Sequence, residues 1–135
     1  MQLDEVRQSF FDYFTDLGYL RHDASSLIPG NDPSVLFTTA GMQQFKDCYS
    51  SPLDAPAKSI VTVQPVFRTS DIGEVGDATH LTMFEMLGNF RFGEESSMKM
   101  KETTIKEAWN FIHQKLGVVK DRVSATVFKG DKLTP

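Results

Sequence analysis

The chain has 135 residues, which is enough for one ordinary domain. Its 14 Lys and Arg against 18 Asp and Glu give a formal net charge of −4, and 40% of its residues are hydrophobic. This balance is typical of a soluble globular protein and excludes a disordered tail, a collagen-like fibre and a coiled coil. The negative charge excludes a generally basic nucleic-acid binder, so any nucleic acid would have to contact a local basic patch or a part of the protein outside this chain.

Cys48 is the only cysteine, which excludes an intrachain disulfide and a cysteine-cluster zinc site. A single cysteine fits a reducing compartment, and we expect a cytoplasmic protein. The N-terminal stretch MQLDEVRQSFFDYF is acidic and amphipathic, unlike a signal peptide. No apolar run reaches the length needed to cross a bilayer, so we expect no membrane segment.

Apolar residues at helical spacing predict a first helix: Val6, Phe10, Phe14 and Leu17. Gly18 is expected to end this helix. A turn-rich stretch follows at 25–34, and Val35 to Phe37 is expected to form a short buried strand. Thr39 is then expected to cap a second helix.

Two extended segments are predicted in the middle of the chain. Ile60 to Arg68 is rich in Val, Ile and Phe, and Pro65 within it indicates a sheet edge or a bulge. His80 to Met86 alternates between two faces and is expected to return antiparallel to the first segment. Leu87 to Asn89 is predicted to be a turn.

A third helix is predicted in the last third of the chain and is expected to end at Gly117. The apolar residues that indicate it are Ile105, Ala108, Trp109, Ile112 and Leu116. The alternation over 123–128 predicts a last strand. The sequence shows no internal repeat and no low-complexity segment.

Most chemical motifs are missing from the sequence. It has no Gly-rich phosphate loop, no Gly-x-Ser-x-Gly and no histidine pair at metal spacing, because its three histidines are far apart. We interpret them as surface or partly bonded histidines and predict no metal-ligating residues. They are His22, His80 and His113.

The loop at 69–79 between the two predicted strands is a candidate functional segment, because long loops of this kind often carry function. It has no Lys or Arg and three acidic residues: Asp71, Glu74 and Asp77. In the hairpin, Arg68 would lie beside the return strand and could bind a phosphate or carboxylate. Phe84 could offer a flat face to a base, and Glu85 could accept a hydrogen bond or help to hold a metal ion. On spacing alone, a structural interpretation is favoured, in which Arg68 pairs with Glu85 or a loop carboxylate and Phe84 is core.

Six segments of the sequence, in this order along the chain, resemble those of a known protein family. They are RQSFFDYFTDLGY at 7–19, SSLIPGNDPSVLFTTAGMQQFKD at 25–47, QPVFR at 64–68, DIGEVGDATHLTMFEMLGNFRFG at 71–93, KEAWNFI at 106–112 and DRVSATVF at 121–128. Through them the sequence resembles the alanyl-tRNA synthetase family of class II aminoacyl-tRNA synthetases over nearly its whole length. The blocks LFTTAGMQQFK and FEMLGNF are the most specific.

This resemblance implies an α+β fold, with an incomplete class II synthetase-like antiparallel sheet flanked by helices. Residues 1–135 would be the N-terminal portion of the catalytic domain, with the first two class II motifs, and the third motif would lie beyond Pro135. The implied reaction uses ATP and Mg²⁺ to convert L-alanine to alanyl-adenylate and then transfers alanine to tRNA(Ala). Contacts to tRNA would lie mostly outside this chain. Activity would need the downstream part, supplied for example by a complementing C-terminal chain.

The resemblance also implies roles for individual residues. Arg68 would be catalytic, because it contacts the ATP α-phosphate and the alanine carboxylate region and stabilises the negative charge that develops there. The implied ATP-binding set is Arg68, His80, Phe84, Glu85 and Met86. Within it Phe84 would stack on adenine, and Met86 would stand where main-chain groups read the adenine edge. The implied loop, which closes over ATP and approaches the tRNA acceptor end, contains Asp71, Glu74 and Asp77.

The sequence departs from the family in several places. Leu81 stands where many members have a second histidine, the loop lacks the usual Gly-Gly-Lys-His element, and the stretch GEESSMKMKETT is longer. Leu81 and the acidic loop mildly favour an alternative, a non-catalytic synthetase-like module that binds a nucleotide or regulates a partner. A third alternative is an unstable fragment with an open sheet edge and an uncovered apolar face, which would aggregate or dimerise.

Overall fold

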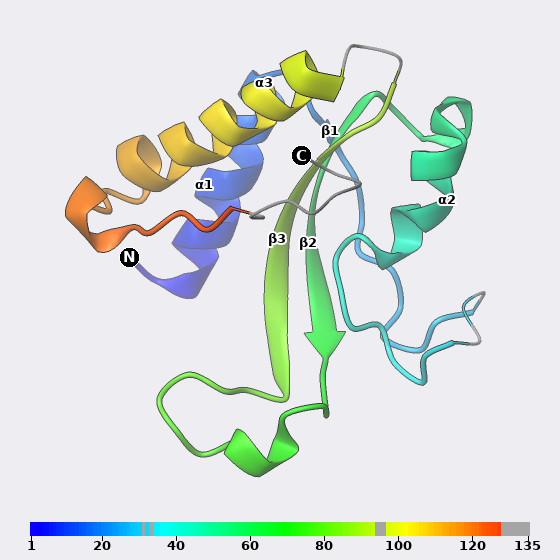
Figure 1. Ribbon diagram of the computed structural model, residues 1–135, viewed down its shortest axis with the longest axis vertical. Coiled ribbons are helices and arrows are strands. Elements are labelled where there is room, and N and C mark those ends of the chain that lie inside the picture. The colour runs from blue at the N-terminus through cyan, green and yellow to red at the C-terminus, as the bar shows by residue number, and fades with distance from the viewer. Residues whose placement is uncertain (31, 33, 94–96, 128–135) are drawn as a thin grey trace, which may run out of the picture.

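A long β-hairpin forms the centre of the computed structural model, which describes residues 1–30, 32, 34–93 and 97–127 (Figure 1). Its strands are β2 (Ser59–Phe67) and β3 (Met83–Arg91), which pair antiparallel. The short strand β1 (Leu20–Arg21) pairs in parallel with the start of β2, giving the order β1-β2-β3. The predicted α+β class is therefore confirmed, but the sheet of the described residues is mixed and not purely antiparallel.

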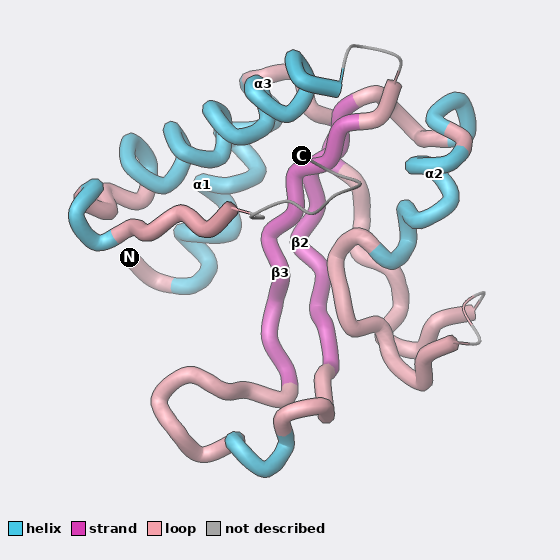
Figure 2. Tube along the Cα trace, in the orientation of Figure 1, coloured by secondary structure: helices cyan, strands magenta, loops and turns pink. Residues whose placement is uncertain are grey.

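Helices cover the sheet from two sides. α1 (Leu3–Asp16) and α3 (Ser97–Asn110) lie on one side of the hairpin in Figure 1, and α2 (Lys46–Ser50) lies on the other. α3 continues into a π-helical turn, Phe111–Lys115. Short 3₁₀ turns occur at Gln43–Phe45, Pro52–Asp54, Ile72–Glu74 and Lys120–Arg122. Figure 2 shows that loops make up much of the rest, and the loop between β2 and β3, at 68–82, extends beyond the free end of the hairpin.

The two faces of the sheet carry separate hydrophobic cores. On one face α1 and the π-helical turn pack on β2 through aromatic rings, in a cluster formed by Phe10, Phe11, Phe14, Tyr19, Val61, Val63 and Phe111. On the other face the segment around α2 packs on the sheet through Phe45, Cys48, Ile60 and Phe92. Both faces are therefore covered near the end of the hairpin where β2 begins, and the free end is left for the long loop.

The first predicted helix is confirmed. Its buried residues are Phe10, Phe11 and Phe14, and Gly18 follows it with a φ of +86°, a conformation that favours glycine. At the N-terminus, the Gln2 main-chain N–H donates to the Glu5 carboxylate, which satisfies a helix-end donor.

The predicted strand at Val35 to Phe37 is wrong. This stretch is loop, and Leu36 is 86% exposed. Buried Thr38 holds the loop instead, because its N–H donates to the Leu27 carbonyl and its hydroxyl to the Ser26 carbonyl. Tertiary hydrogen bonds have overridden the local apolar signal.

The prediction that Thr39 caps the second helix is also wrong. Its N–H donates to the Gln43 side chain, and helical structure begins only with the 3₁₀ turn at Gln43. This leaves the Thr39 carbonyl free to accept a hydrogen bond from elsewhere in the fold.

β2 is central in the strand order, but β1 pairs only with Ile60 and Val61, so at Pro65 the described residues give β2 no strand partner on that side and the expected edge is present locally. The pairing with β3 continues through Pro65 in regular register, so the bulge that was the alternative does not form there. The register explains why the strand tolerates it. The Val61 carbonyl accepts from His22 and the Phe67 N–H donates to Thr38, so these odd-numbered residues of β2 turn their peptide groups away from β3. Because β1 ends opposite Val61, the missing N–H of Pro65 removes no ladder hydrogen bond.

The predicted turn at Leu87 to Asn89 is also wrong, because β3 runs straight through it. A Cβ at Gly88 would lie 2.6 Å from the Phe90 ring, so the glycine makes room for an aromatic ring and does not form a turn. The return strand, expected from His80, starts only at Met83. On its outer side β3 has no strand partner among the described residues, which is the open edge that the sequence predicted.

The third predicted helix is confirmed, and Gly117 follows it with a φ of +67°. Residues 123–127 form no strand, and Val127 is 89% exposed, so the predicted last strand is wrong over these residues; Phe128 lies outside the described residues. No described helix has the length and apolar character needed to cross a membrane.

Candidate functional site

Three of the predicted site residues share one face of the hairpin. Gln64 pairs with Met86 and Val66 with Phe84, and Arg68 follows two residues later, where its N–H donates to the Thr82 carbonyl. Because every second strand residue points to the same face, the side chains of Arg68, Phe84 and Met86 lie together. This is the face opposite α1.

The guanidinium of Arg68 is held without being neutralised. Its Nε donates to the Thr39 carbonyl at 2.8 Å, and its Nη2 lies 3.6 Å from the Met86 Sδ. Its Cζ is 5.5 Å from the centroid of the Phe84 ring, within cation–π range. Arg68 forms no ion pair with any residue that the structure describes, so the interpretation in which it pairs with Glu85 or a loop carboxylate is not realised.

A cavity of about 140 Å³ lies between the hairpin end and the long loop. It is lined by Arg68, Asp71, Val75, Thr79, His80, Leu81 and Phe84. The structure thus brings Arg68, Phe84, His80 and Asp71 to one place. Leu81, which stands where the resemblance implies a histidine, is 64% exposed beside them.

Asp77 organises the end of the loop. One carboxylate oxygen accepts the N–H groups of Thr79 and His80 at 2.7 and 2.6 Å, and the other lies 2.7 Å from the His80 Nδ1. These bonds, those from His80 first, lower the pKa of Asp77 to about 2. Glu74 completes a group whose possible ligand atoms, with those of Asp77 and His80, lie within 4.8 Å of one another. Sequence spacing had not indicated that group.

Glu85 is not brought to the cavity. Its side chain lies on the α1 face, where the Arg7 Nη2 donates to it at 2.8 Å and the Arg7 Nε at 3.1 Å. Sequence reasoning missed Arg7, because 78 residues separate it from Glu85. The strict alternation along the predicted strand did place Glu85 opposite Phe84 and Met86.

Gln64 is a second residue that sequence reasoning missed. Its side chain is fully buried in the central strand, accepts the Ser25 N–H at 2.8 Å and donates to the Ser25 carbonyl at 3.0 Å. It also accepts from Gln44 at 3.1 Å. Gln64 therefore holds both ends of the segment that presents the Thr39 carbonyl to Arg68. A polar residue between apolar neighbours in a predicted strand was the available signal.

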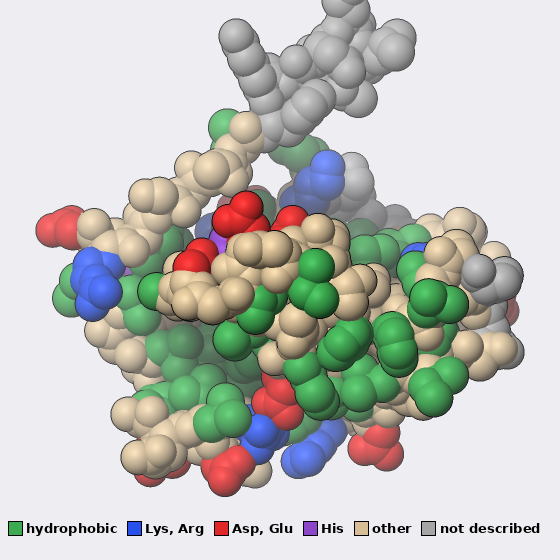
Figure 3. Space-filling model, turned by 90° about the horizontal axis from the view of Figure 1, so that it is seen from below, with side chains coloured by type: hydrophobic (Ala, Val, Ile, Leu, Met, Phe, Trp, Pro, Cys, Tyr) green, Lys and Arg blue, Asp and Glu red, His purple; other side chains and the backbone are tan. Residues whose placement is uncertain are grey.

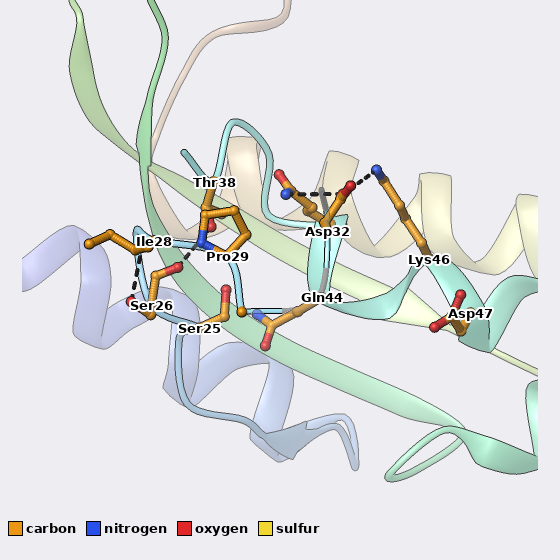
Figure 4. Close-up of a pocket in the computed structure, with 11 residues that line it drawn as sticks. Ser25, Ser26, Ile28, Pro29, Asp32, Thr38, Gln44, Lys46 and Asp47 are labelled. Atoms are coloured by element: carbon orange, nitrogen blue, oxygen red, sulfur yellow. Dashed lines mark hydrogen bonds and ion pairs between the residues drawn. The ribbon is translucent and has the colours of Figure 1, made fainter. Parts of the chain in front are cut away.

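A larger cavity, of about 410 Å³, lies beside the segment that precedes α2 (Figure 4). Lys46 and Asp32 point toward each other there and form an ion pair of 2.7 Å, and Gln43 also donates to Asp32. Because these groups bind one another, they present no unpaired charge to a ligand. This cavity contains none of the predicted site residues.

Seen from the hairpin end, the surface carries many hydrophobic side chains (Figure 3). Those exposed in the long loop and at the start of β3 include Ile72, Val75, Leu81 and Met83. The long loop is therefore apolar as well as acidic.

Comparison with known proteins identifies the family. The model of the class II (A) tRNA synthetases matches residues 5–134, and the chain belongs to this family. Similar proteins include the alanine–tRNA ligase of Rubrobacter xylanophilus, which is 43% identical over 135 residues, the whole of this chain and 15% of that protein. The alanine–tRNA ligase of Dehalococcoides mccartyi is 44% identical over 128 residues, 95% of this chain and 14% of the relative. That of Borrelia hermsii is 40% identical over 137 residues, covering 100% of this chain and 22% of the relative. The chain thus spans only 14% to 22% of the length of these relatives.

Proposed function

We propose that this chain is the N-terminal portion of the catalytic domain of an alanine–tRNA ligase and that it carries the part of the active site that binds ATP. The observation that supports this most directly is Arg68, whose guanidinium is oriented by a main-chain carbonyl and keeps its charge beside the Phe84 ring. A fixed cation beside a flat aromatic face suits a nucleotide, which combines a phosphate with a base.

In the proposed reaction, Arg68 binds the α-phosphate of ATP while the carboxylate of L-alanine attacks it. The attack forms alanyl-adenylate and releases pyrophosphate, and negative charge builds up on the phosphate oxygens in the transition state. A guanidinium held in place before the reaction stabilises that charge without reorganising. Phe84 stacks on adenine, and Met86 contacts the base from the same face. A second step, transfer of alanine to tRNA(Ala), would use contacts outside this chain, whose own net charge is −4.

The loop residues have a different proposed role. Asp71 and His80 line the cavity beside Arg68, and Asp77 fixes the His80 ring through its Nδ1. We propose that the loop, with Glu74, closes over bound ATP. A main-chain role of Met86 and a nucleotide contact by Glu85 remain predictions, and the position of Glu85 on the α1 face speaks against direct contact.

Among the residues that the structure describes, none form a group that fits a magnesium site of its own. In the cluster of Glu74, Asp77 and His80, both oxygens of Asp77 are occupied by hydrogen bonds, and imidazole is a poor ligand for this ion. Mg²⁺ commonly binds through substrate phosphates with few protein ligands. We therefore propose Mg²⁺ only as the companion of ATP and assign no step to it.

A second candidate function is a non-catalytic nucleotide-binding or regulatory module. Exposed Leu81 in the cavity, where the resemblance implies a histidine, favours it. The two functions differ in their need for a complementing C-terminal chain. In either case we expect a cytoplasmic protein.

The decisive experiment is titration calorimetry of ATP, with and without Mg²⁺, on the wild-type chain and on Arg68→Ala. We expect binding that the substitution abolishes, and an unchanged circular dichroism spectrum. The downstream region of a relative, added in trans, should then restore alanine-dependent pyrophosphate exchange. ATP binding without exchange in a well-folded mixture would favour the module. No ATP binding by the folded wild type, either alone or with the downstream region, would reject an ATP-binding role for this chain.

A further inference from the structure

Arg7 and Glu85 join the first helix to the strand that carries Phe84 and Met86. Two nitrogens of Arg7, Nε and Nη2, donate to the same oxygen of Glu85, at 3.1 and 2.8 Å. The side chains are only 32% and 29% exposed, so water competes less for this pair than for a fully exposed one. Arg7 Nη1 also contacts Asp4, which holds the guanidinium against its own helix. The pair is therefore a fixed connection between α1 and β3.

This part of β3 has little other support on the α1 face. The neighbours of Glu85 on that face, Met83 and Leu87, are 56% and 38% exposed. On its outer side the strand has no partner among the described residues. An edge strand with exposed side chains is held less firmly than a central one, so the ion pair contributes strongly to its position.

We propose that Arg7 is a positioning residue, which acts through Glu85 to set the position of Phe84 and Met86 on the nucleotide-binding face and thereby the affinity for ATP. Successive strand side chains point to opposite faces, so a movement of Glu85 toward or away from α1 moves its two neighbours along the direction in which they project. This inference rests on the proposed function.

The movement would also reach Arg68. Met86 Sδ lies 3.6 Å from the Arg68 Nη2, and the Phe84 ring lies 5.5 Å from its Cζ. The Thr39 carbonyl holds the Nε of Arg68 from a different segment, so this contact stays in place when β3 shifts. Loss of the Arg7 pair would therefore change the fit between the aromatic face and the guanidinium.

The first test measures ATP affinity in Arg7→Gln, Arg7→Lys and a matched control, Arg91→Gln. The control breaks another partly buried ion pair of β3, between Arg91 and Glu107, which lies toward the opposite end of the strand from Phe84. We expect Arg7→Gln to weaken ATP binding about tenfold, as a coupled contact would. Arg7→Lys, which keeps the charge but has a single donor nitrogen in place of Nε and Nη2, should recover most of that loss. Arg91→Gln should lower the midpoint of thermal unfolding and leave ATP affinity unchanged.

The second test needs no nucleotide. The chain has six methionines, and ¹³C-methyl labelling gives each a signal, which Met86→Leu would assign to Met86. We expect Arg7→Gln to shift the Met86 methyl signal and Arg91→Gln to leave it in place. Both measurements are made at a temperature where circular dichroism shows every variant folded.

The outcomes separate the two proposals. An Arg7→Gln variant that loses stability but keeps the wild-type ATP affinity and the wild-type Met86 signal would overturn the role of Arg7. A wild-type chain that binds no ATP, while Met86 still responds to Arg7→Gln, would overturn the proposed function and support the positioning of the strand. If the Met86 signal does not move and ATP does not bind, both are wrong.

Discussion

The Nε of Arg68 donates a hydrogen bond of 2.8 Å to the main-chain carbonyl of Thr39, 29 residues away in the sequence. A neutral acceptor orients the guanidinium and leaves its full charge for an anion, whereas a carboxylate would have neutralised it. The carbonyl is available because Thr39 precedes the helical turn and does not cap it.

This arrangement predicts that lysine cannot replace Arg68. Arg68→Lys keeps the charge but loses the planar fork that binds Thr39 and a phosphate together, so ATP affinity should fall about tenfold or more. Stability should change by less than about 0.5 kcal/mol, because the side chain is exposed. Calorimetry with ATP tests this, and Arg122→Lys, in an exposed 3₁₀ turn, is the control. Equal affinity in Arg68→Lys and the wild type would contradict it.

Phe84 should contribute to nucleotide binding through its flat face. Phe84→Leu should weaken ATP binding by about 1–3 kcal/mol, because the base loses its stacking partner. Phe37→Leu is the control: Phe37 is 41% exposed, and its ring packs at a tilt of 58° on Phe67, 5.0 Å away, whose strand position is on the face opposite to Phe84. Comparable losses in both variants would show that the effect is not stacking.

Asp77 should make the conformational order of the loop depend on pH. Its pKa is lowered from 3.8 to about 2, so the ionised carboxylate stabilises the loop above about pH 4, and this contribution is lost as the pH falls toward about 2. The NMR signals of the Thr79 and His80 amides should titrate with a midpoint near 2. Asp77→Asn should abolish the titration and Asp71→Asn should not. A midpoint near 3.8 in the wild type would contradict the hydrogen bonds to Asp77.

Tyr19 should titrate late in alkali. Burial, and then its hydrogen bond to Glu107, raise its pKa to about 12. The folded pKa lies above the ordinary value of 10, so the stabilising contribution is complete below about pH 10 and is lost between about pH 10 and 12. Phenolate absorbance reports all three tyrosines, and it should include a step near pH 12 that Tyr19→Phe removes.

The same substitution should lower stability. Tyr19→Phe leaves Glu107 and Arg91 without the hydroxyl that bridges them at 2.5 and 2.8 Å, which should cost about 1–3 kcal/mol in urea unfolding. An unchanged free energy of unfolding would mean that Arg91 and Glu107, 2.7 Å apart, suffice without the hydroxyl.

Gly88→Ala should destabilise the hairpin. Its Cβ would lie 2.6 Å from the Phe90 ring, so the ring must move out of its contact with Phe45, at a cost of about 1–3 kcal/mol. In a Phe90→Leu background, Gly88→Ala should lower the free energy of unfolding by less than it does in the wild type. Gly73→Ala, which meets no atom within 4 Å, should be nearly neutral in the same urea unfolding experiment. Equal stability of Gly88→Ala and the wild type would contradict the close approach.

Much of the fold could be predicted where local periodicity decides it. The spacing of Phe10 and Phe14 predicted α1, and the alternation around Phe84 placed it on the face of Met86 and opposite Glu85. The predictions were wrong where a residue that is typical of one local structure is present for a tertiary contact instead. Gly88 is typical of a turn, but in the structure it makes room for the Phe90 ring. Leu36 is typical of a buried strand, but it is exposed in a loop that buried Thr38 holds in place.

By itself, the sequence determined the first and third helices, the hairpin, the family, and Arg68 and Phe84 as the best candidates for a nucleotide site. These depend on the spacing of residues near one another in the chain. Only the tertiary structure decided what holds that site: Thr39 for Arg68, and Arg7 for Glu85. The physical reason is that a hydrogen bond across 29 or 78 residues depends on how loops and helices pack on the sheet, and no local pattern records that packing.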